Sequence, residues 1–252
     1  MKSTGFHPWA VIDRLAMSST APIHQLPLLY NGQRLDRDEY YRRVELWSAQ
    51  GRDPRGIERL EGVVYMPAAI RFEQHAEPQG FLIAWLGVYA AATSGVQFGG
   101  NATARLDPDN DPEGDAILRI RPEFGGQSRI DRRGYIDGPP ELTAEIAGSS
   151  TQRDLEVKLE VYRRNGVCEY LVWETIAEEL YWFALEDGNY VRLLPDPDGI
   201  LRSRVFPGLW LDVQALLRGD LATVLSVAQH GVASDAHREF LATLAARRTA
   251  AP

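Results

Sequence analysis

The sequence predicts a mixed α/β fold, and three features of its 252 residues carry that prediction. Segments with the two-residue alternation of strands and segments with the 3.6-residue periodicity of helices occur in mixed order. One strand–helix–strand unit spans residues 141–173, and such a unit joins parallel strands. The composition, 44% hydrophobic and 25% charged residues, is that of a chain that buries a core.

The first half of the chain alternates between helix and strand. Asp36 or Asp38 stands where an acidic residue caps the first helix, because its side chain accepts hydrogen bonds from free N–H groups. Pro78 suits only the first turns of the second helix, or else kinks it. The expected elements are a helix at 36–50, strand-like residues with the turn pair Glu61-Gly62 at 57–66, a helix at 71–93, and strands within 95–121.

The second half begins with residues 127–138, whose two turn signals predict a short hairpin or a polar excursion. The helix that follows the next strand has Ser150 or Thr151 to cap it and Asn165-Gly166 to end it. The expected elements are a strand at 141–147, a helix at 151–166, strands at 169–174, 178–185 and 189–195, and two closing helices at 212–230 and 234–248.

The composition changes along the chain and separates three regions, and the overall charge and hydropathy limit the classes of function. We expect an N-terminal arm at 1–35, a main domain at 36–212 and a C-terminal helical extension at 213–252. The net charge of −8 argues against nucleic-acid binding through overall positive charge, although a local basic patch remains compatible. No apolar stretch approaches the length of a membrane span, and the N-terminus lacks a secretory core, so we expect a cytoplasmic protein.

Several classes of site are excluded by missing motifs. The single cysteine, Cys168, rules out an intramolecular disulfide and a multi-cysteine zinc site. The chain has no P-loop, no dinucleotide-binding glycine fingerprint, no GxSxG elbow and no HExxH helix. P-loop nucleotide hydrolases, serine hydrolases and zincin-type proteases are therefore set aside.

Two carboxylates are candidates for a metal site. Alternation along residues 141–147 places Glu145 with Glu141 and Thr143 on the more polar face of the strand, not in the core. Asp115 begins the strand-like run DAILRI. Carboxylates from neighbouring strands suit Mg²⁺, which prefers oxygen ligands and keeps several waters. The alternative, that each simply faces solvent, stays open.

Lys158 lies beside the apolar stripe of the next helix. From there it reaches toward Glu145, or it pairs with Asp154 at i,i+4, and the residues alone do not separate these alternatives. A metal with acidic ligands polarises a phosphoryl group and lowers the pKa of a bound water, while a nearby lysine balances phosphate charge. This combination of residues suits phosphodiester hydrolysis.

Weaker candidates lie upstream and in a basic run. Glu58 is either a further metal-facing carboxylate or an exposed residue, and His75 is expected to be solvated rather than in contact with substrate. The densest basic run is nominated for contacts with the nucleic-acid backbone, against the alternative of a solvated hairpin. Its members are Arg119, Arg121, Arg129, Arg132 and Arg133.

The run PPELTAEIAGSSTQRDLEVKLEVYRRNGVCEYLVWE, with IERLEGVVYMP and EGDAILRI before it, resembles a known family over residues 35–212. It is similar to the putative restriction endonuclease family of the PD-(D/E)xK nuclease superfamily. The resemblance implies a central mixed sheet flanked by helices, a Mg²⁺- or Mn²⁺-dependent endonuclease acting on DNA, and a homodimer.

The resemblance also assigns residues. Asp115 and Glu145 match the two metal-holding carboxylates, although Gly114 stands where the family usually has proline. Ala147 occupies the position of the standard lysine, and Lys158 matches the lysine that this family displaces to the next helix. The implied catalytic residues are Asp115, Glu145, Lys158 and the upstream Glu58.

Two functions therefore follow from the sequence. The first is a metal-dependent endonuclease. The second is a catalytically inactive binding or assembly protein that keeps the nuclease fold, with the apolar C-terminal helices as its interface.

Overall fold

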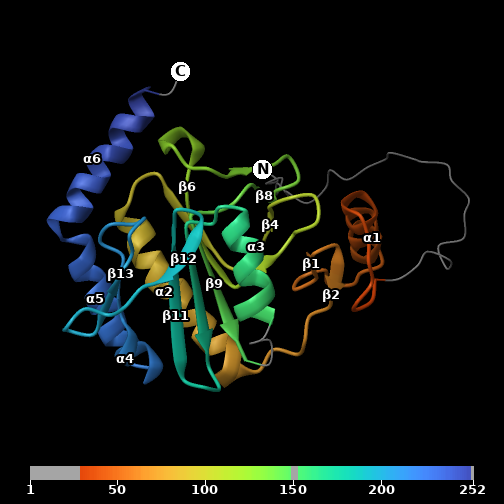
Figure 1. Cartoon of the computed structure of the whole chain (residues 1–252), viewed down its shortest axis with the longest axis horizontal. Coiled ribbons are helices and arrows are strands. Elements are labelled where there is room, and N and C mark those ends of the chain that lie inside the picture. The colour runs from red at the N-terminus through yellow and green to blue at the C-terminus, as the bar shows by residue number, and fades with distance from the viewer. Residues whose placement is uncertain (1–28, 149–152, 251–252) are drawn as a thin grey trace, which may run out of the picture.

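The computed structural model describes residues 29–148 and 153–250. Residues 153, 154, 249 and 250 are described by their backbone alone. Within this part of the chain, the central sheet has six strands in the order β12–β11–β10–β9–β6–β3 (Figure 1). β9 and β10 are parallel and the other neighbours are antiparallel, which confirms the mixed α/β class. The strands are β3 (Val96–Gly99), β6 (Ala116–Ile120), β9 (Leu142–Ala147), β10 (Glu169–Glu174), β11 (Glu179–Glu186) and β12 (Asn189–Arg192).

Helices cover both faces of this sheet. α2 (Glu77–Ala92) starts with Pro78 in its first turn, as predicted, and buries Leu82, Trp85 and Leu86 against the apolar side chains of β6 and β9. The other face is covered by η4 (Arg153–Lys158), which is π-helical, and α3 (Leu159–Arg164). The predicted caps Ser150 and Thr151 lie outside the described residues, whereas Asn165 ends α3 as predicted.

The expectation that β9 exposes its more polar face is wrong, because η4 and α3 cover that face. The strand was predicted to bury one face only, but Glu141, Thr143 and Glu145 are each less than 5% exposed. A strand in the middle of a sheet with helices on both sides is buried on both faces, whatever its alternation. Glu145 is therefore a buried carboxylate, and its surroundings must satisfy its charge.

A helix and a hairpin lie beside the central sheet, on the right in Figure 1. α1 (Arg37–Ala49) is capped by Asp36, whose carboxylate accepts from Glu39 N at 2.8 Å, as predicted. β1 (Glu58–Leu60) and β2 (Val63–Tyr65) pair antiparallel. Glu61 and Gly62 join them with φ of 52° and 71°, and two left-handed residues make the type I′ turn that suits a hairpin.

A second sheet has the order β5–β4–β8–β7 in the described part of the chain. It consists of β4 (Ala102–Arg105), β5 (Glu113–Gly114), β7 (Arg129–Ile130) and β8 (Ile136–Asp137). β7 and β8 pair antiparallel, which confirms the predicted hairpin within 127–138. The 3₁₀ turn η3 (Pro122–Phe124) links β6 to this hairpin.

The C-terminal region differs from its prediction in two ways. An unpredicted hairpin forms from β13 (Ile200–Arg202) and β14 (Trp210–Asp212). The first closing helix is two helices, α4 (Val213–Leu217) and α5 (Leu221–Val232), because Gly219 turns the chain at φ 74° and Asp220 caps a new start. α6 (Asp235–Ala250) follows.

The apolar side chains of these helices do not form an exposed interface, which corrects that expectation. Val224, Ala228 and Leu244 belong to the main core, together with residues of α2 and the central sheet. Burying them there removes apolar surface from water in the folded chain itself. No helix among the described residues is long and apolar enough to cross a membrane.

Candidate active site

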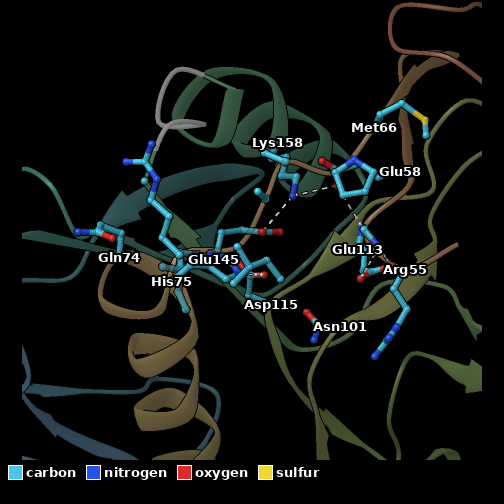
Figure 2. A pocket seen from close by; sticks show the side chains of 18 of the residues that line it. Arg55, Glu58, Met66, Gln74, His75, Asn101, Glu113, Asp115, Glu145 and Lys158 are labelled. Atoms are coloured by element: carbon cyan, nitrogen blue, oxygen red, sulfur yellow. Dashed lines mark hydrogen bonds and ion pairs between the residues drawn. The ribbon is translucent and has the colours of Figure 1, made fainter. Parts of the chain in front are cut away.

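The candidate site is a pocket of about 700 Å³ at the end of the central sheet where β9 stops and β6 begins. Figure 2 shows side chains converging on it from several elements. The sequence-predicted residues Glu58, Asp115, Glu145 and Lys158 all line it. The structure thus brings together, from β1, the start of β6, β9 and η4, four residues that are scattered in sequence.

Lys158 is the link between two of the carboxylates. It is the last residue of η4 and is 2% exposed. Its Nζ lies 2.9 Å from Glu145 Oε2 and 3.0 Å from Glu58 Oε2. A buried ammonium needs such partners, because an uncompensated charge out of water costs several kcal/mol. The alternative partner Asp154 has its side chain outside the described residues.

Glu145 is held on its other oxygen as well. Tyr162 of α3 donates from its hydroxyl to Glu145 Oε1 at 2.9 Å. Burial, and then the negative charge of Glu145, raise the pKa of Tyr162 well above its ordinary value, so this phenol stays a donor. One helical segment therefore supplies both the cation and the hydroxyl that orient Glu145.

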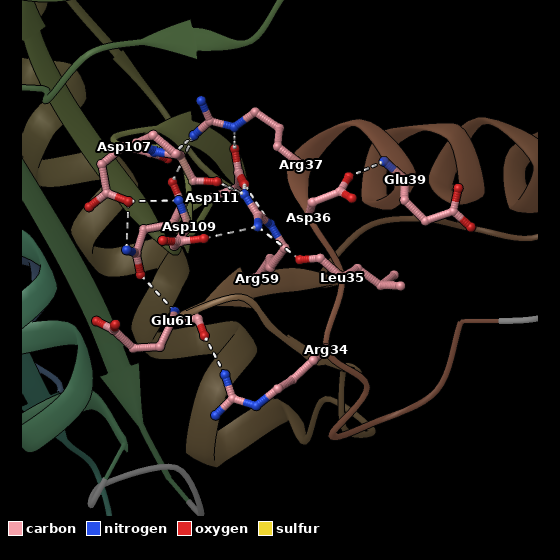
Figure 3. A network of polar contacts seen from close by, with 12 residues as sticks. Arg34, Leu35, Asp36, Arg37, Glu39, Arg59, Glu61, Asp107, Asp109 and Asp111 are labelled. Carbon is pink, nitrogen blue, oxygen red and sulfur yellow. Dashed lines mark hydrogen bonds and ion pairs between the residues drawn. The ribbon is translucent and has the colours of Figure 1, made fainter.

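Glu58 is buried, which settles the alternative of an exposed residue. Its neighbour Arg59 forms a β-bridge with Asp111, with Asp111 N donating to Arg59 O at 2.7 Å. Because side chains alternate along a strand, fixing Arg59 on one side points Glu58 to the other, toward Lys158. Figure 3 shows the charged network that surrounds Arg59.

Asp115 is fixed by the backbone and by a histidine. Its Oδ2 accepts from Ile146 N at 2.8 Å, and its carbonyl oxygen accepts from Gln79 Nε2 at 2.9 Å. His75 Nε2 lies 3.3 Å from Asp115 Oδ1, so the expectation that this histidine is merely solvated is wrong. His75 belongs to η2 (Phe72–Ala76), a second π-helical segment, and such segments are frequent at functional sites.

Gly114 has a steric reason to replace the family's usual proline. A Cβ at this position would lie 2.8 Å from Thr143 Cγ2 and 3.1 Å from Ile117 Cγ1. A larger residue here would therefore require the side chains of Thr143 and Ile117, on the strands next to the site, to shift.

Glu113 is a site residue that the sequence analysis missed. Its carboxylate accepts from Gly56 N at 3.0 Å, and its own N–H donates to Glu58 Oε2 at 3.3 Å. Burial, with a smaller contribution from the negative charges of Glu58 and Asp115, raises its pKa from 4.5 to about 7. Its spacing of two from Asp115 was the available signal, because residues i and i+2 of a strand share a face.

None of the nominated arginines lines the pocket, and the expectation is wrong for Arg119, while for the other four it stays a prediction. Arg119 is buried and donates to Ser128 Oγ at 3.0 Å and Gln97 Oε1 at 2.5 Å, so it is unavailable to a ligand. Arg129 and Arg133 belong to the β7–β8 hairpin, at the edge of its sheet opposite β5. The arginines that line the pocket are Arg55 and Arg71.

The donor set of the pocket fits a hard divalent cation. Asp115 and Glu145 offer carboxylate oxygens from adjacent strands, and Glu58 and Glu113 add further negative charge. Mg²⁺ needs only one or two protein carboxylates, since it keeps several waters and takes substrate phosphate oxygens. The described residues hold no group of three His, Cys, Asp or Glu side chains placed to bind a metal, and Asp115 and Glu145, on neighbouring strands, are the candidate pair.

A mixed sheet that brings two acidic strand residues and a helix lysine to one pocket defines the restriction-endonuclease-like class. The family model of Uma2, described as "Putative restriction endonuclease", matches residues 38–214, and the chain belongs to this family. The comparison with curated proteins found no match.

One solved structure supports the fold independently. It is described as a putative nuclease belonging to DUF820 from Anabaena variabilis ATCC 29413. It is similar to this structure with a TM-score of 0.53 and 11% sequence identity, covering 70% of this chain and 97% of that chain. At that identity the likeness shows a common fold and leaves the chemistry to be argued from the pocket.

Proposed function

We propose that this protein is an endonuclease that hydrolyses phosphodiester bonds in DNA with the help of Mg²⁺ or Mn²⁺. The observation that carries the proposal is the position of Lys158 Nζ between Glu145 and Glu58, in the pocket that also holds Asp115. Family membership supports the nuclease class. The metal rests on the carboxylates of the pocket, and DNA as the substrate rests on the family resemblance.

Each side chain has a defined role in this proposal. Asp115 and Glu145 hold the cation, which when bound polarises the phosphoryl group and lowers the pKa of a water. Lys158 orients the attacking water or balances the charge that develops on the phosphate. Glu58 keeps the ammonium of Lys158 in place and supplements the negative field at the metal position.

The test is metal-dependent cleavage of supercoiled and single-stranded DNA by the wild type, Glu145→Gln and Lys158→Ala. We expect cleavage with Mg²⁺ or Mn²⁺, none in EDTA, and a loss of at least about 10²-fold in each variant. Glu160→Gln is the matched control, because Glu160 lies on α3 but is exposed and pairs with Arg163. Thermal unfolding checks that each variant is folded.

The opposite results have a definite meaning. Variants that cleave as fast as the wild type would remove the chemical basis of the proposal. A folded wild type that cleaves no DNA with either metal would favour the inactive binding or assembly protein.

We also propose a homodimer, on the strength of the family resemblance. Since the apolar residues of α4 to α6 lie in the core, the contact would use another surface. Light scattering after size-exclusion chromatography tests this, and a mass equal to one chain at micromolar concentration would contradict it.

A further inference from the structure

Three large apolar side chains are exposed at the pocket or next to it in the chain. Ile70, Phe72 and Ile176 are 65%, 70% and 69% exposed. Ile70 and Ile176 line the pocket, and Phe72 follows Arg71, which also lines it. Single exposed apolar residues are ordinary, but Ile70 and Ile176 line the same pocket from segments far apart in the sequence, and Phe72 lies two positions from Ile70. We call them the apolar rim.

The backbone beneath the apolar rim is anchored. Thr175 precedes Ile176, and its N–H donates to Ala147 O at 3.2 Å while its hydroxyl donates to Gln74 O at 2.8 Å. On the other side, the N–H groups of His75 and Ala76 both donate to Arg71 O, at 3.0 and 3.2 Å. The two segments are thus tied to each other and to the end of β9. Backbone hydrogen bonds therefore fix the segments that carry the apolar rim, while its side chains stay exposed to solvent.

The charge around the pocket limits what can bind there. Proteins that hold duplex DNA mainly by its phosphates use roughly 6–10 contacts. Here Arg55 and Arg71 line the pocket among several carboxylates, Arg55 already pairs with Asp53 at 2.6 Å, and the whole chain has a net charge of −8. Contacts from two arginines can position a strand in the pocket, but they are too few to hold a duplex there by its phosphates. The apolar rim is then the natural source of the remaining affinity.

We propose that the substrate is DNA with unpaired bases beside the scissile phosphate, and that the apolar rim binds those bases. This inference rests on the proposed function and specifies its substrate class. In an intact duplex the base faces are hidden in the stack, so an apolar rim has little to contact. In a single strand or a bubble, a base stacks on the Phe72 ring while Ile70 and Ile176 pack against base faces. Arg71 lies within the same segment and contacts the adjoining phosphate.

The first experiment compares three matched substrates: a duplex, the same duplex with a central mismatched bubble, and one isolated strand. Wild type is expected to cleave the bubble and the strand at least about tenfold faster than the duplex. Phe72→Ala and the double variant Ile70→Ser/Ile176→Ser should raise KM for the strand about fivefold or more, with kcat unchanged. Leu194→Ser is the control, because Leu194 is 77% exposed and lies outside the pocket lining.

A second experiment separates this inference from the proposed function. Equilibrium binding of the fluorescent strand and duplex is measured in EDTA, where no cleavage is expected. Tighter binding of the strand, weakened about fivefold in the rim variants but not in Leu194→Ser, supports the inference even if no DNA is ever cleaved. Equal binding of strand and duplex, cleavage of the duplex as fast as the bubble, or rim variants with wild-type KM would overturn it while leaving a nuclease in place.

Discussion

Two clusters of buried charge lie on either side of β1, and they are built differently. In the first, which Figure 3 shows around Arg37, Arg59 and Asp111, one oxygen of Asp111 accepts from Arg37 Nε at 3.1 Å and the other accepts from Arg59 Nε and Nη2 at 3.0 and 2.7 Å. The first oxygen also accepts from the hydroxyl of Tyr41 at 3.0 Å. In the second, Lys158 stands between Glu58 and Glu145, with further carboxylates beside it at an open pocket (Figure 2).

The difference separates a structural cluster from a functional one. The Asp111 cluster is closed: two arginines share the one carboxylate of Asp111, and Arg59 and Asp111 are wholly buried. Arg59 also donates to Leu35 O and Pro108 O, so it ties the hairpin to the loop before Asp115. The pocket cluster has more carboxylates than cations and faces solvent. Such an imbalance costs stability in the free protein and is suited to receive a cation.

The largest expected effect comes from breaking the closed cluster. Asp111→Asn removes the buried charge partner of Arg59 and leaves only the exposed Asp109, 3.9 Å away, so we expect the free energy of unfolding to fall by about 3–5 kcal/mol. Urea denaturation followed by tryptophan fluorescence measures it.

Glu58→Gln is the matched change in the open cluster. Lys158 keeps Glu145 as a charged partner there, and one excess carboxylate is removed, so the loss should be at most about 1 kcal/mol. Equal losses in the two variants would show that the clusters do not differ in kind.

A third buried carboxylate, Glu169, has neither an arginine nor a lysine side chain as a partner among the described residues, and its contribution to stability is expected to depend on pH. Glu169 lies at the opposite end of β10 and accepts from Ser203, Trp182 and the N–H groups of Arg204 and Val205. These donors carry no charge on the contacting atoms, and burial raises the pKa of Glu169 from 4.5 to about 7. We expect Glu169→Gln to lower the free energy of unfolding by about 1–3 kcal/mol at pH 5, because Trp182 or a backbone N–H loses an acceptor.

The sign of the pH effect follows from the raised pKa. The folded state holds the Glu169 proton more tightly, so this group's contribution is fully present below about pH 4.5 and is lost as the pH rises to about 7. The stability advantage of the wild type over Glu169→Gln should therefore shrink between pH 5 and pH 8. An advantage that stays constant over this interval would show that the carboxylate is ionised throughout.

The smallest effect is expected at the hairpin arginines. Arg129→Ala and Arg133→Ala should change DNA cleavage by less than about twofold, because both pair with surface acids away from the pocket. Arg71→Ala should weaken binding and reduce the slope of log affinity against log salt by about 1. Titrations at several salt concentrations distinguish these outcomes, and a reduced slope for Arg133→Ala would restore the hairpin as a DNA contact.

Local patterns predicted most of the elements for a physical reason. The N-cap of α1 and the I′ turn between β1 and β2 are each formed by residues within a few positions of one another. A short stretch of sequence therefore contains all the residues that predict them. The hairpin of β13 and β14 was missed because each strand is only three residues long and its partner lies several residues away. The break at Gly219 was missed because apolar periodicity continues across it.

The sequence by itself determined most of the order of strands and helices, and it singled out Asp115, Glu145, Lys158 and Glu58. Only the tertiary structure decided that Glu145 is buried, that Lys158 joins it to Glu58, and that His75 and Glu113 belong beside them. The reason is the distance in sequence between the residues that interact. Caps and turns are made with near neighbours, whereas the partner of a buried charge is chosen by which distant segments the sheet and its covering helices bring to the same place.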